Sequence, residues 1–191
     1  DEPFYGFYLK NTDINHPGKK EVLLSMETDW DSIAKKMTGI PPNEEKVWYQ
    51  KHMAQHNLPG VDLSWTRQVT NCFLIRDPKE VILSYSKKYD VTHFNLLGYP
   101  QQVELYHLLT GGNGVEPAIV DAKDILMNPR DILTKLCSAV GIPFSDDMLS
   151  WPAGPRETEG DWSKYWYSSI KAATGFQPYT SPNEELPHEL E

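Results

Sequence analysis

Short apolar runs separated by amphipathic stretches predict strands that alternate with helices along this chain. The clearest run, Cys72-Phe73-Leu74-Ile75, is short and rich in branched side chains, as a buried strand is. A second run, Ala118-Ile119-Val120, ends at Asp121, and residues 47–51 have strand composition. The alternation predicts an α/β fold whose mostly parallel sheet carries helices on both faces.

Helical periodicity and end signals place the helices between these runs. Apolar positions on one face, followed by Gly141 and then Pro143, predict a helix over residues 131–140. The other helices are expected over residues 19–26, 31–37, 63–68 and 100–109. Three strands make a thin parallel sheet for 191 residues, so we expect further chain in front of Asp1.

The passage from the first strand into the next helix carries the strongest functional signal. Asp77 suits an N-cap, Pro78 suits the first helical position, and Glu80 completes a capping box. The helix start offers unpaired N–H groups and partial positive charge, with Arg76 beside it. Ser84 follows that arginine by eight positions, just over two turns into the helix. The pattern predicts that both side chains converge on one anion; the alternative is a capped strand–helix junction with a surface arginine.

Composition and charge narrow the class of protein. With 191 residues, 39% of them hydrophobic, the chain suits one domain with a good core. A net charge of −9 argues against broad nucleic-acid binding, although a cleft can be locally positive. No apolar run approaches the roughly 20 residues of a membrane-spanning helix. Cys72 and Cys137 are expected to be reduced core residues, which favours the cytoplasm, and no Cys/His cluster has zinc spacing. We therefore expect no metal.

The segment that contains Arg76 resembles the second signature of the sulfotransferase superfamily. In that signature an arginine and a serine eight positions apart hold the 3′-phosphate of the sulfuryl donor, 3′-phosphoadenosine 5′-phosphosulfate. The whole chain is similar to the bacterial sulfotransferase-like family, P-loop proteins whose domain also occurs in chains labelled branched-chain aminotransferase-like. The other matching segments are DEPFY at 1–5, HPG at 16–18, YQKHMAQH at 49–56, LGYPQQVELY at 97–106, VDAKDIL at 120–126, LSWPAGPR at 149–156 and WYSSIKAATGFQPY at 166–179.

The resemblance implies a three-layer P-loop, sulfotransferase-like sandwich formed by a single domain over residues 1–179, followed by a polar acidic tail over 180–191. It also implies a strand and a glycine-containing loop upstream of Asp1 that cradle the 5′-phosphosulfate. The GGNG stretch at 111–114 is no substitute, because it follows a helix and lacks the Lys and hydroxyl of that loop. We therefore expect the chain to be a piece of a longer one.

The same resemblance implies the ligands of the donor. Arg76 and Ser84 are its anchors. Arg156 lies in a segment faintly like the late RKGxxGDW loop of cytosolic sulfotransferases, which closes over the same 3′-phosphate. Here Glu157 and Thr158 replace the Lys and Gly that follow the arginine. Arg156 is thus a candidate third phosphate ligand, with a surface loop arginine as the alternative.

Candidate catalytic groups follow from the resemblance as well. Glu2 stands in a Glu-Pro pair that supplies the acceptor-activating carboxylate in several sulfotransferase branches, which makes it a candidate general base. Lys51 and His52 stand where cytosolic members carry a lysine and a catalytic histidine separated by one residue. Because they are adjacent here, only one is expected to point into the cleft. His52 competes with Glu2 as base, and Lys51 would stabilise the leaving phosphate.

Other aromatic and histidine residues have structural explanations as well. His56 and His93 are expected at the surface. Six aromatic residues are expected either to line an acceptor pocket or to pack in the core: Phe4, Tyr5, Trp48, Trp162, Tyr165 and Trp166.

Two functions remain open. One is transfer of a sulfuryl group to a hydroxyl or amine of a small molecule, with a homodimer as one possible assembly. The other is a non-catalytic nucleotide-binding or interaction module. Aminotransferase activity is rejected, because no lysine has a recognisable pyridoxal-phosphate context.

Overall fold

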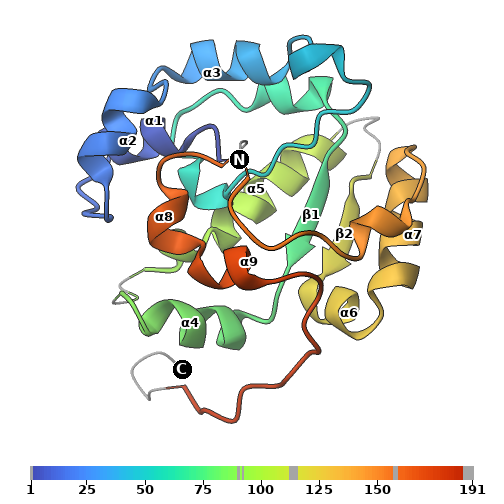
Figure 1. The fold of residues 1–191 in the computed structure, drawn as a ribbon. Helices are drawn as coiled ribbons and strands as arrows, with labels where there is room; N and C mark the ends of the chain where they lie inside the picture. The colour runs from blue at the N-terminus through green and yellow to red at the C-terminus, as the bar shows by residue number, and fades with distance from the viewer. Residues whose placement is uncertain (1, 90, 92, 112–115, 157–158, 187–191) are drawn as a thin grey trace. The chain divides into compact units, whose positions relative to one another are not determined.

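The computed structural model describes residues 2–89, 91, 93–111, 116–156 and 159–186 (Figure 1). The chain divides into two compact units. The N-terminal unit comprises Asp1–Val69 with Ala153–Ala172, and the sheet unit comprises Thr70–Pro152 with Ala173–Glu191. The prediction of a single domain over residues 1–179 stays a prediction, and each unit is described by itself below.

Short helices build the N-terminal unit. They are α1 (Tyr5–Lys10), α2 (Lys19–Ser25), α3 (Trp30–Met37), α8 (Ser163–Trp166) and α9 (Ser168–Ala172), with 3₁₀ turns η1 (Pro42–Glu44), η2 (Ala54–His56) and η3 (Ser64–Gln68). Two buried apolar clusters hold them together, one around Phe4, Trp30 and Trp65 and the other around Tyr5, Leu9 and Trp162. The expected helices over 19–26 and 31–37 are confirmed, and the one over 63–68 is a 3₁₀ turn.

The strand predicted over residues 47–51 is wrong, since none of these residues lies in a strand. Val47 is 53% exposed and Tyr49 is 79% exposed, so the segment runs at the surface. It is held by side chains instead: Trp48 packs against the first apolar cluster, and Gln50 donates to the Met37 carbonyl at 2.8 Å. Strand composition alone gives no strand where no neighbouring strand completes the ladder.

Two parallel strands, β1 (Cys72–Ile75) and β2 (Ala118–Asp121), form the sheet within the described residues (Figure 1). Phe73 pairs with Ile119 and Ile75 with Asp121, so the carboxyl ends of the strands meet at one edge. The helices of this unit are α4 (Pro78–Ser86), α5 (Tyr99–Thr110), α6 (Ala122–Met127) and α7 (Pro129–Val140), with 3₁₀ turns η4 (Phe94–Leu97) and η5 (Asp146–Met148). The α/β class and the parallel pairing are thus confirmed.

The end of α7 is the clearest agreement between a sequence signal and the backbone. Gly141 has φ of +76°, in the left-handed region that side chains with a Cβ avoid. The Gly141 N–H donates to the Ser138 carbonyl at 3.4 Å, and the Ile142 N–H donates to the Cys137 carbonyl at 2.9 Å. These two bonds are those of a Schellman motif, so Gly141 ends the helix as predicted.

The strands of the sheet unit are less covered than a buried parallel sheet. Leu74 is 57% exposed and Ile119 is 50% exposed. Cys72 is exposed too, so its expected place in the core is wrong, whereas Cys137 is buried against Met148. Both cysteines are free thiols.

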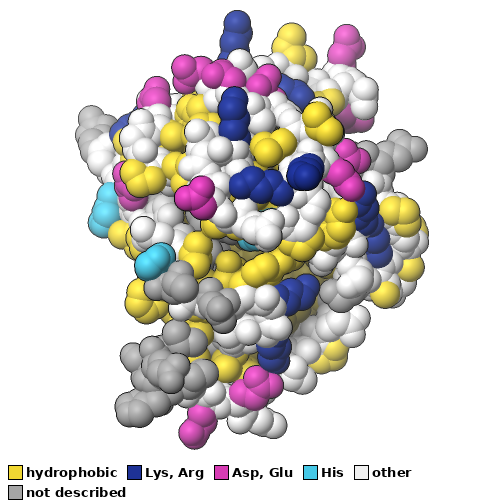
Figure 2. All heavy atoms as spheres, turned by 90° about the vertical axis from the view of Figure 1, so that its left-hand side faces the viewer, with side chains coloured by type: hydrophobic (Ala, Val, Ile, Leu, Met, Phe, Trp, Pro, Cys, Tyr) yellow, Lys and Arg dark blue, Asp and Glu magenta, His cyan; other side chains and the backbone are white. Residues whose placement is uncertain are grey.

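The surface and the helices bear on the kinds of partner expected. On the face drawn in Figure 2, lysine and arginine side chains lie among acidic and apolar ones. Within the described ranges, none of the helices combines the length and apolar character that crossing a membrane requires.

Candidate functional site

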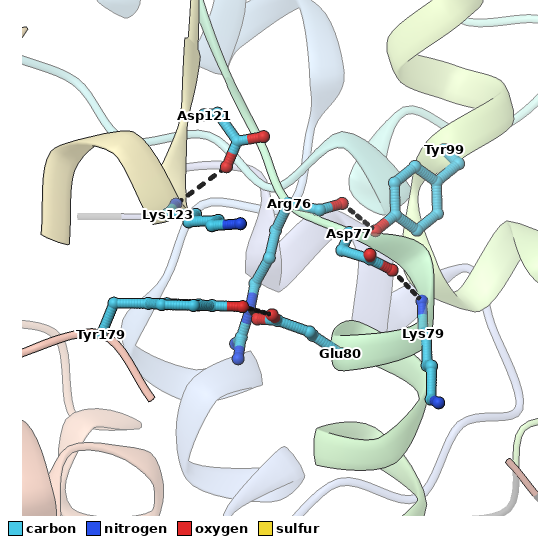
Figure 3. A network of polar contacts seen from close by, with 8 residues as sticks. All are labelled: Arg76, Asp77, Lys79, Glu80, Tyr99, Asp121, Lys123 and Tyr179. Atoms are coloured by element: carbon cyan, nitrogen blue, oxygen red, sulfur yellow. Dashed lines mark hydrogen bonds and ion pairs between the residues drawn. The ribbon is translucent and has the colours of Figure 1, made fainter. Parts of the chain in front are cut away.

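Four side chains of the sheet unit form a polar cluster where β1 and β2 end, which we call the Arg76 cluster: Arg76, Glu80, Lys123 and Tyr179 (Figure 3). The Arg76 Nε donates to Glu80 Oε2 at 2.8 Å. The Tyr179 hydroxyl donates to Glu80 Oε1 at 2.6 Å. The Lys123 ammonium lies 5.3 Å from the centroid of the Tyr179 ring, within cation–π range. Two cations are thereby gathered around one carboxylate and one phenol.

Both strands lead directly into aspartate-capped helices, which fixes where these cations stand. The Asp77 carboxylate accepts a 2.8 Å bond from the Lys79 N–H, and the Asp121 carboxylate accepts one of 2.8 Å from the Lys123 N–H. The N-cap predicted at Asp77 is therefore confirmed. The capping box is wrong, because the Glu80 side chain bonds to Arg76 and the tyrosine instead of closing back on the cap.

Glu80 is the electrostatic centre of this cluster. The residue is only 8% exposed. Its hydrogen bond from Tyr179, and then that from Arg76, hold the pKa of Glu80 below its ordinary value. The carboxylate is therefore charged at neutral pH and gives the guanidinium a fixed partner. Tyr99 also holds this turn by donating to the Arg76 carbonyl at 2.8 Å.

Ser84 lies one turn beyond Glu80 on the same face of α4, since residues four apart in a helix are neighbours. Its side chain is exposed. The Arg76 side chain is 46% exposed and reaches along α4 as far as Glu80. Arg76 therefore contacts, through Glu80, the face of α4 that also carries Ser84.

A second cluster lies in the N-terminal unit, and we call it the Lys51 cluster: Glu2, Lys51, Trp162 and Tyr167. The Lys51 ammonium is ion-paired with the Glu2 carboxylate and donates to the Tyr167 hydroxyl at 3.2 Å. It lies 5.6 Å from the Tyr167 ring centroid and 6.0 Å from that of Trp162. Burial disfavours the charged amine, but Glu2 and then Tyr167 together more than offset this, so the pKa of Lys51 is raised.

His52 turns into different surroundings from Lys51. Its ring lies 5.7 Å from the Phe4 ring and 5.5 Å from the Trp65 ring, centroid to centroid. Its Nε2 is 3.0 Å from Gln50 Oε1. Burial of the ring among these groups lowers the pKa of His52 to about 4, although part of the residue is exposed. The two adjacent side chains therefore go to different places: Lys51 to Glu2, and His52 to the rings of Phe4 and Trp65.

The surface position expected for His56 is wrong, because the residue is only 3% exposed. Its ring lies 5.4 Å from that of Tyr5 and 4.7 Å from that of Tyr8, centroid to centroid. Burial, and then the charge of Lys51, lower the pKa of His56 to about 3. The histidine is thus a neutral core residue, while His93 is exposed.

Arg156 is exposed and belongs to the N-terminal unit, and its carbonyl accepts from the Glu159 N–H at 3.1 Å. Glu157 and Thr158, on which its likeness to the late sulfotransferase loop depends, lie outside the described residues. The GGNG stretch also lies outside them from residue 112 onward. The role of Arg156 as a phosphate ligand stays a prediction.

Most of the aromatic candidates belong to the core rather than to a pocket. Phe4, Tyr5 and Trp162 are each 3% exposed or less. Trp48 and Trp166 pack against the two apolar clusters. Tyr165 is the exception, because it is 38% exposed and lines a surface hollow beside Gly18.

Sequence reasoning missed three members of these clusters: Lys123, Tyr167 and Tyr179. Tyr167 and Tyr179 both fall in the WYSSIKAATGFQPY segment, but nothing local assigns them a partner. Glu80 carried a usable signal, because its spacing of four from Arg76 suits an ion pair. Among the described residues, no group of three or more His, Cys, Asp or Glu side chains could hold a metal ion.

A family model described as a sulfotransferase domain matches residues 1–189. The chain belongs to the sulfotransferase-domain family. This sulfotransferase domain is 34% identical over 176 residues to branched-chain-amino-acid aminotransferase-like protein 2 of Arabidopsis thaliana, and 33% identical to protein 1 of the same name. Each alignment covers 92% of this chain but only 31% of the relative, so the domain spans about a third of the curated relatives it matches. No solved structure matches it.

Proposed function

We propose that this domain binds 3′-phosphoadenosine 5′-phosphosulfate and transfers its sulfuryl group to a hydroxyl or amine of a small molecule. The proposal includes the three-layer P-loop-like sandwich of the family. The observation that carries it is that Arg76, at the end of a parallel strand, contacts through Glu80 the face of α4 that also carries Ser84. Ligands of open parallel α/β sheets collect at this edge.

The groups on this face suit a terminal phosphate. A guanidinium presents paired N–H donors to phosphate oxygens, and a serine hydroxyl adds a further donor. The Arg76 guanidinium is accessible and is oriented by Glu80. The N-terminal amide of α4 nearest the cap is already taken by Asp77. Recognition of the 3′-phosphate is therefore assigned to side chains rather than to the helix terminus.

The Lys51 cluster supplies the groups that the transfer itself needs. The acceptor oxygen or nitrogen attacks sulfur, and the bond from sulfur to the bridging oxygen breaks. The electron pair stays on the released 3′-phosphoadenosine 5′-phosphate, and the acceptor proton passes to a base. Glu2 is assigned as that base and Lys51 as the cation that neutralises charge on the leaving phosphate.

Glu2 is favoured over His52 because of its neighbours. The Glu2 side chain is 12% exposed and is paired with Lys51, so base and cation stand together. The His52 ring is instead held among Phe4, Trp65 and Gln50, with its pKa lowered to about 4.

The donor half of the proposal is tested by calorimetry on the full natural protein. Wild type is expected to bind 3′-phosphoadenosine 5′-phosphate more tightly than adenosine 5′-phosphate. Arg76→Ala should lower the affinity for 3′-phosphoadenosine 5′-phosphate by roughly 10- to 100-fold and remove the preference for it over adenosine 5′-phosphate. Arg130→Ala is the matched control, because that arginine forms an exposed ion pair with Asp146 in the same unit. No binding by wild type would overturn the proposal.

The catalytic half is tested by transfer of labelled sulfate from the donor to a mixture of small hydroxyl and amine acceptors. Glu2→Gln should abolish transfer while nucleotide binding stays within about two-fold. His52→Gln should retain most of the transfer rate. Binding without transfer by wild type would support the non-catalytic nucleotide-binding module instead.

A further inference from the structure

The C-terminal segment, residues 173–186, brings one side chain to the Arg76 cluster from far along the chain. Its first part is fixed by an antiparallel bridge between Gly175 and Ser150 and by a 3.0 Å bond from the Trp151 N–H to the Thr174 carbonyl. The Phe176 ring packs edge-on against Trp151, with centroids 5.4 Å apart. These contacts anchor the segment a few residues before Tyr179.

Beyond Tyr179 the segment is tied again. Glu184 forms an ion pair of 3.2 Å with Lys87, which directly follows α4. The tyrosine is therefore held between two attachment points, both within the sheet unit. Contacts on both sides of Tyr179 therefore help to place it beside Glu80.

The two oxygens of Glu80 have different partners. Oε1 accepts from the tyrosine at 2.6 Å, and Oε2 accepts from Nε of Arg76 at 2.8 Å. Figure 3 shows the terminal nitrogens of Arg76 extending past this carboxylate. A carboxylate with both oxygens available grips a guanidinium through two parallel bonds, which would engage a terminal nitrogen too.

We propose that Tyr179 is a positioning residue that occupies Oε1 of Glu80, so that Glu80 orients Arg76 through Nε and leaves the terminal nitrogens to the donor phosphate. This inference rests on the proposed function. The Tyr179 ring has a second effect, because it also holds Lys123 at 5.3 Å beside the same carboxylate. The hydroxyl and the ring can be tested separately.

The main variant is Tyr179→Phe, which removes the hydroxyl and keeps the ring over Lys123. Glu80 stays charged at neutral pH, so its repulsion of a phosphate is unchanged and only its choice of partners differs. The affinity of the full natural protein for 3′-phosphoadenosine 5′-phosphate is expected to fall roughly three- to ten-fold, as loss of one hydrogen bond predicts. Binding of adenosine 5′-phosphate should hardly change.

Tyr106→Phe is the matched control. That tyrosine also donates to a glutamate, with its hydroxyl 2.9 Å from Glu116 Oε1, but it lies on α5 outside the Arg76 cluster. The affinity of Tyr106→Phe for 3′-phosphoadenosine 5′-phosphate should equal that of wild type. A loss as large as that of Tyr179→Phe would mean that any tyrosine–glutamate bond of this unit matters only for stability, and would overturn the inference.

Rescue separates positioning from general damage. In Tyr179→Phe combined with Glu80→Gln, the competing carboxylate is gone, so affinity should return to within about two-fold of Glu80→Gln alone. Additive losses would contradict the inference. An independent readout is the ¹³C chemical shift of the Glu80 carboxyl, because Tyr179→Phe should raise its pKa whether or not nucleotide binds.

The outcomes distinguish the two proposals. If wild type binds and Arg76→Ala does not, but Tyr179→Phe binds like wild type, the positioning role fails and the proposed function stands. If wild type itself does not bind the nucleotide, the proposed function fails and the positioning role fails with it.

Discussion

Glu80 reaches back from the first turn of α4 to Arg76, with Oε2 2.8 Å from the guanidinium Nε. The pair joins the end of β1 to α4, the helix that follows it. The Glu80 side chain is only 9% exposed, so the carboxylate end of the pair is buried. This unit buries few apolar side chains, chiefly Ile82, Leu83, Leu109 and Cys137. A satisfied carboxylate therefore contributes a larger share of its stability than in a domain with a thick core.

Glu80→Gln is expected to destabilise the protein by about 1–3 kcal/mol at pH 7, because charge-assisted hydrogen bonds become neutral ones. The pKa of Glu80 is lowered in the folded state, so its stabilisation is present above the ordinary value of 4.5 and is lost as the pH falls below it. Urea unfolding at pH 7 and pH 3.5 checks this. The difference between wild type and variant should shrink in acid, and a constant difference would contradict the argument.

The Glu2–Lys51 pair should be worth more than an exposed pair of the same kind. The comparison is Glu21–Lys164, an ion pair whose side chains are each about half exposed. Double-mutant cycles with Gln and Met are expected to give a coupling of about 1–3 kcal/mol for Glu2–Lys51 and a clearly smaller coupling for the surface pair. Equal couplings would show that the Lys51 cluster is solvated.

His56 should make the protein sensitive to mild acid. Its pKa is about 3 in the folded state against an ordinary 6.5, so the unfolded state binds the proton first. The stabilisation is complete above pH 6.5 and declines as the pH falls toward 3. Between pH 7 and pH 5 the unfolding free energy should drop by roughly 2 kcal/mol from this group.

His56→Phe removes the imidazole that takes up a proton in the unfolded state, and it keeps an aromatic ring between Tyr5 and Tyr8. Chemical denaturation at the two pH values should therefore show a smaller loss in this variant. His93→Gln, at an exposed position, serves as control and should keep the full loss. An unchanged pH dependence in His56→Phe would refute the assignment.

Gly6 allows α1 to approach the end of α2 closely. A Cβ at this position would lie 2.7 Å from the Glu27 carbonyl oxygen and 2.9 Å from Met26 Cβ. Gly6→Ala should destabilise by about 1–3 kcal/mol despite the better helix propensity of alanine. Gly141→Ala, which meets no neighbour within 4 Å and strains only its φ of +76°, is the comparison and should cost about 1 kcal/mol. Thermal unfolding measures both.

Residues that start and end helices made parts of this fold predictable from sequence. Asp77 and Pro78 start α4, and Gly141 ends α7, because each signal acts through the backbone of its own neighbours. Residues 47–51 failed for the opposite reason, since a strand depends on a partner elsewhere in the chain. The segment is instead held in place by the side chains of Trp48 and Gln50, and its backbone does not pair with a strand.

The candidate site was predictable to the same extent. The assignment of Arg76 and Ser84 as donor anchors rests on a local spacing, and it stays a prediction. Tyr179 could not be found, because it meets Glu80 across 99 positions of sequence. His56 was misjudged because a histidine in a short polar-looking stretch gives no sign of the two tyrosines that enclose it.

The two attachment points of residues 173–186 have a practical consequence for anyone who shortens this protein. Cutting after α9 at Ala172 would keep every regular helix and strand of the described chain, and by composition it would discard only a polar end. Such a trimmed protein would nevertheless lose Tyr179 and leave a buried carboxylate short of one donor. Domain boundaries drawn for expression should therefore run past Glu184, and purification tags are better kept away from that end.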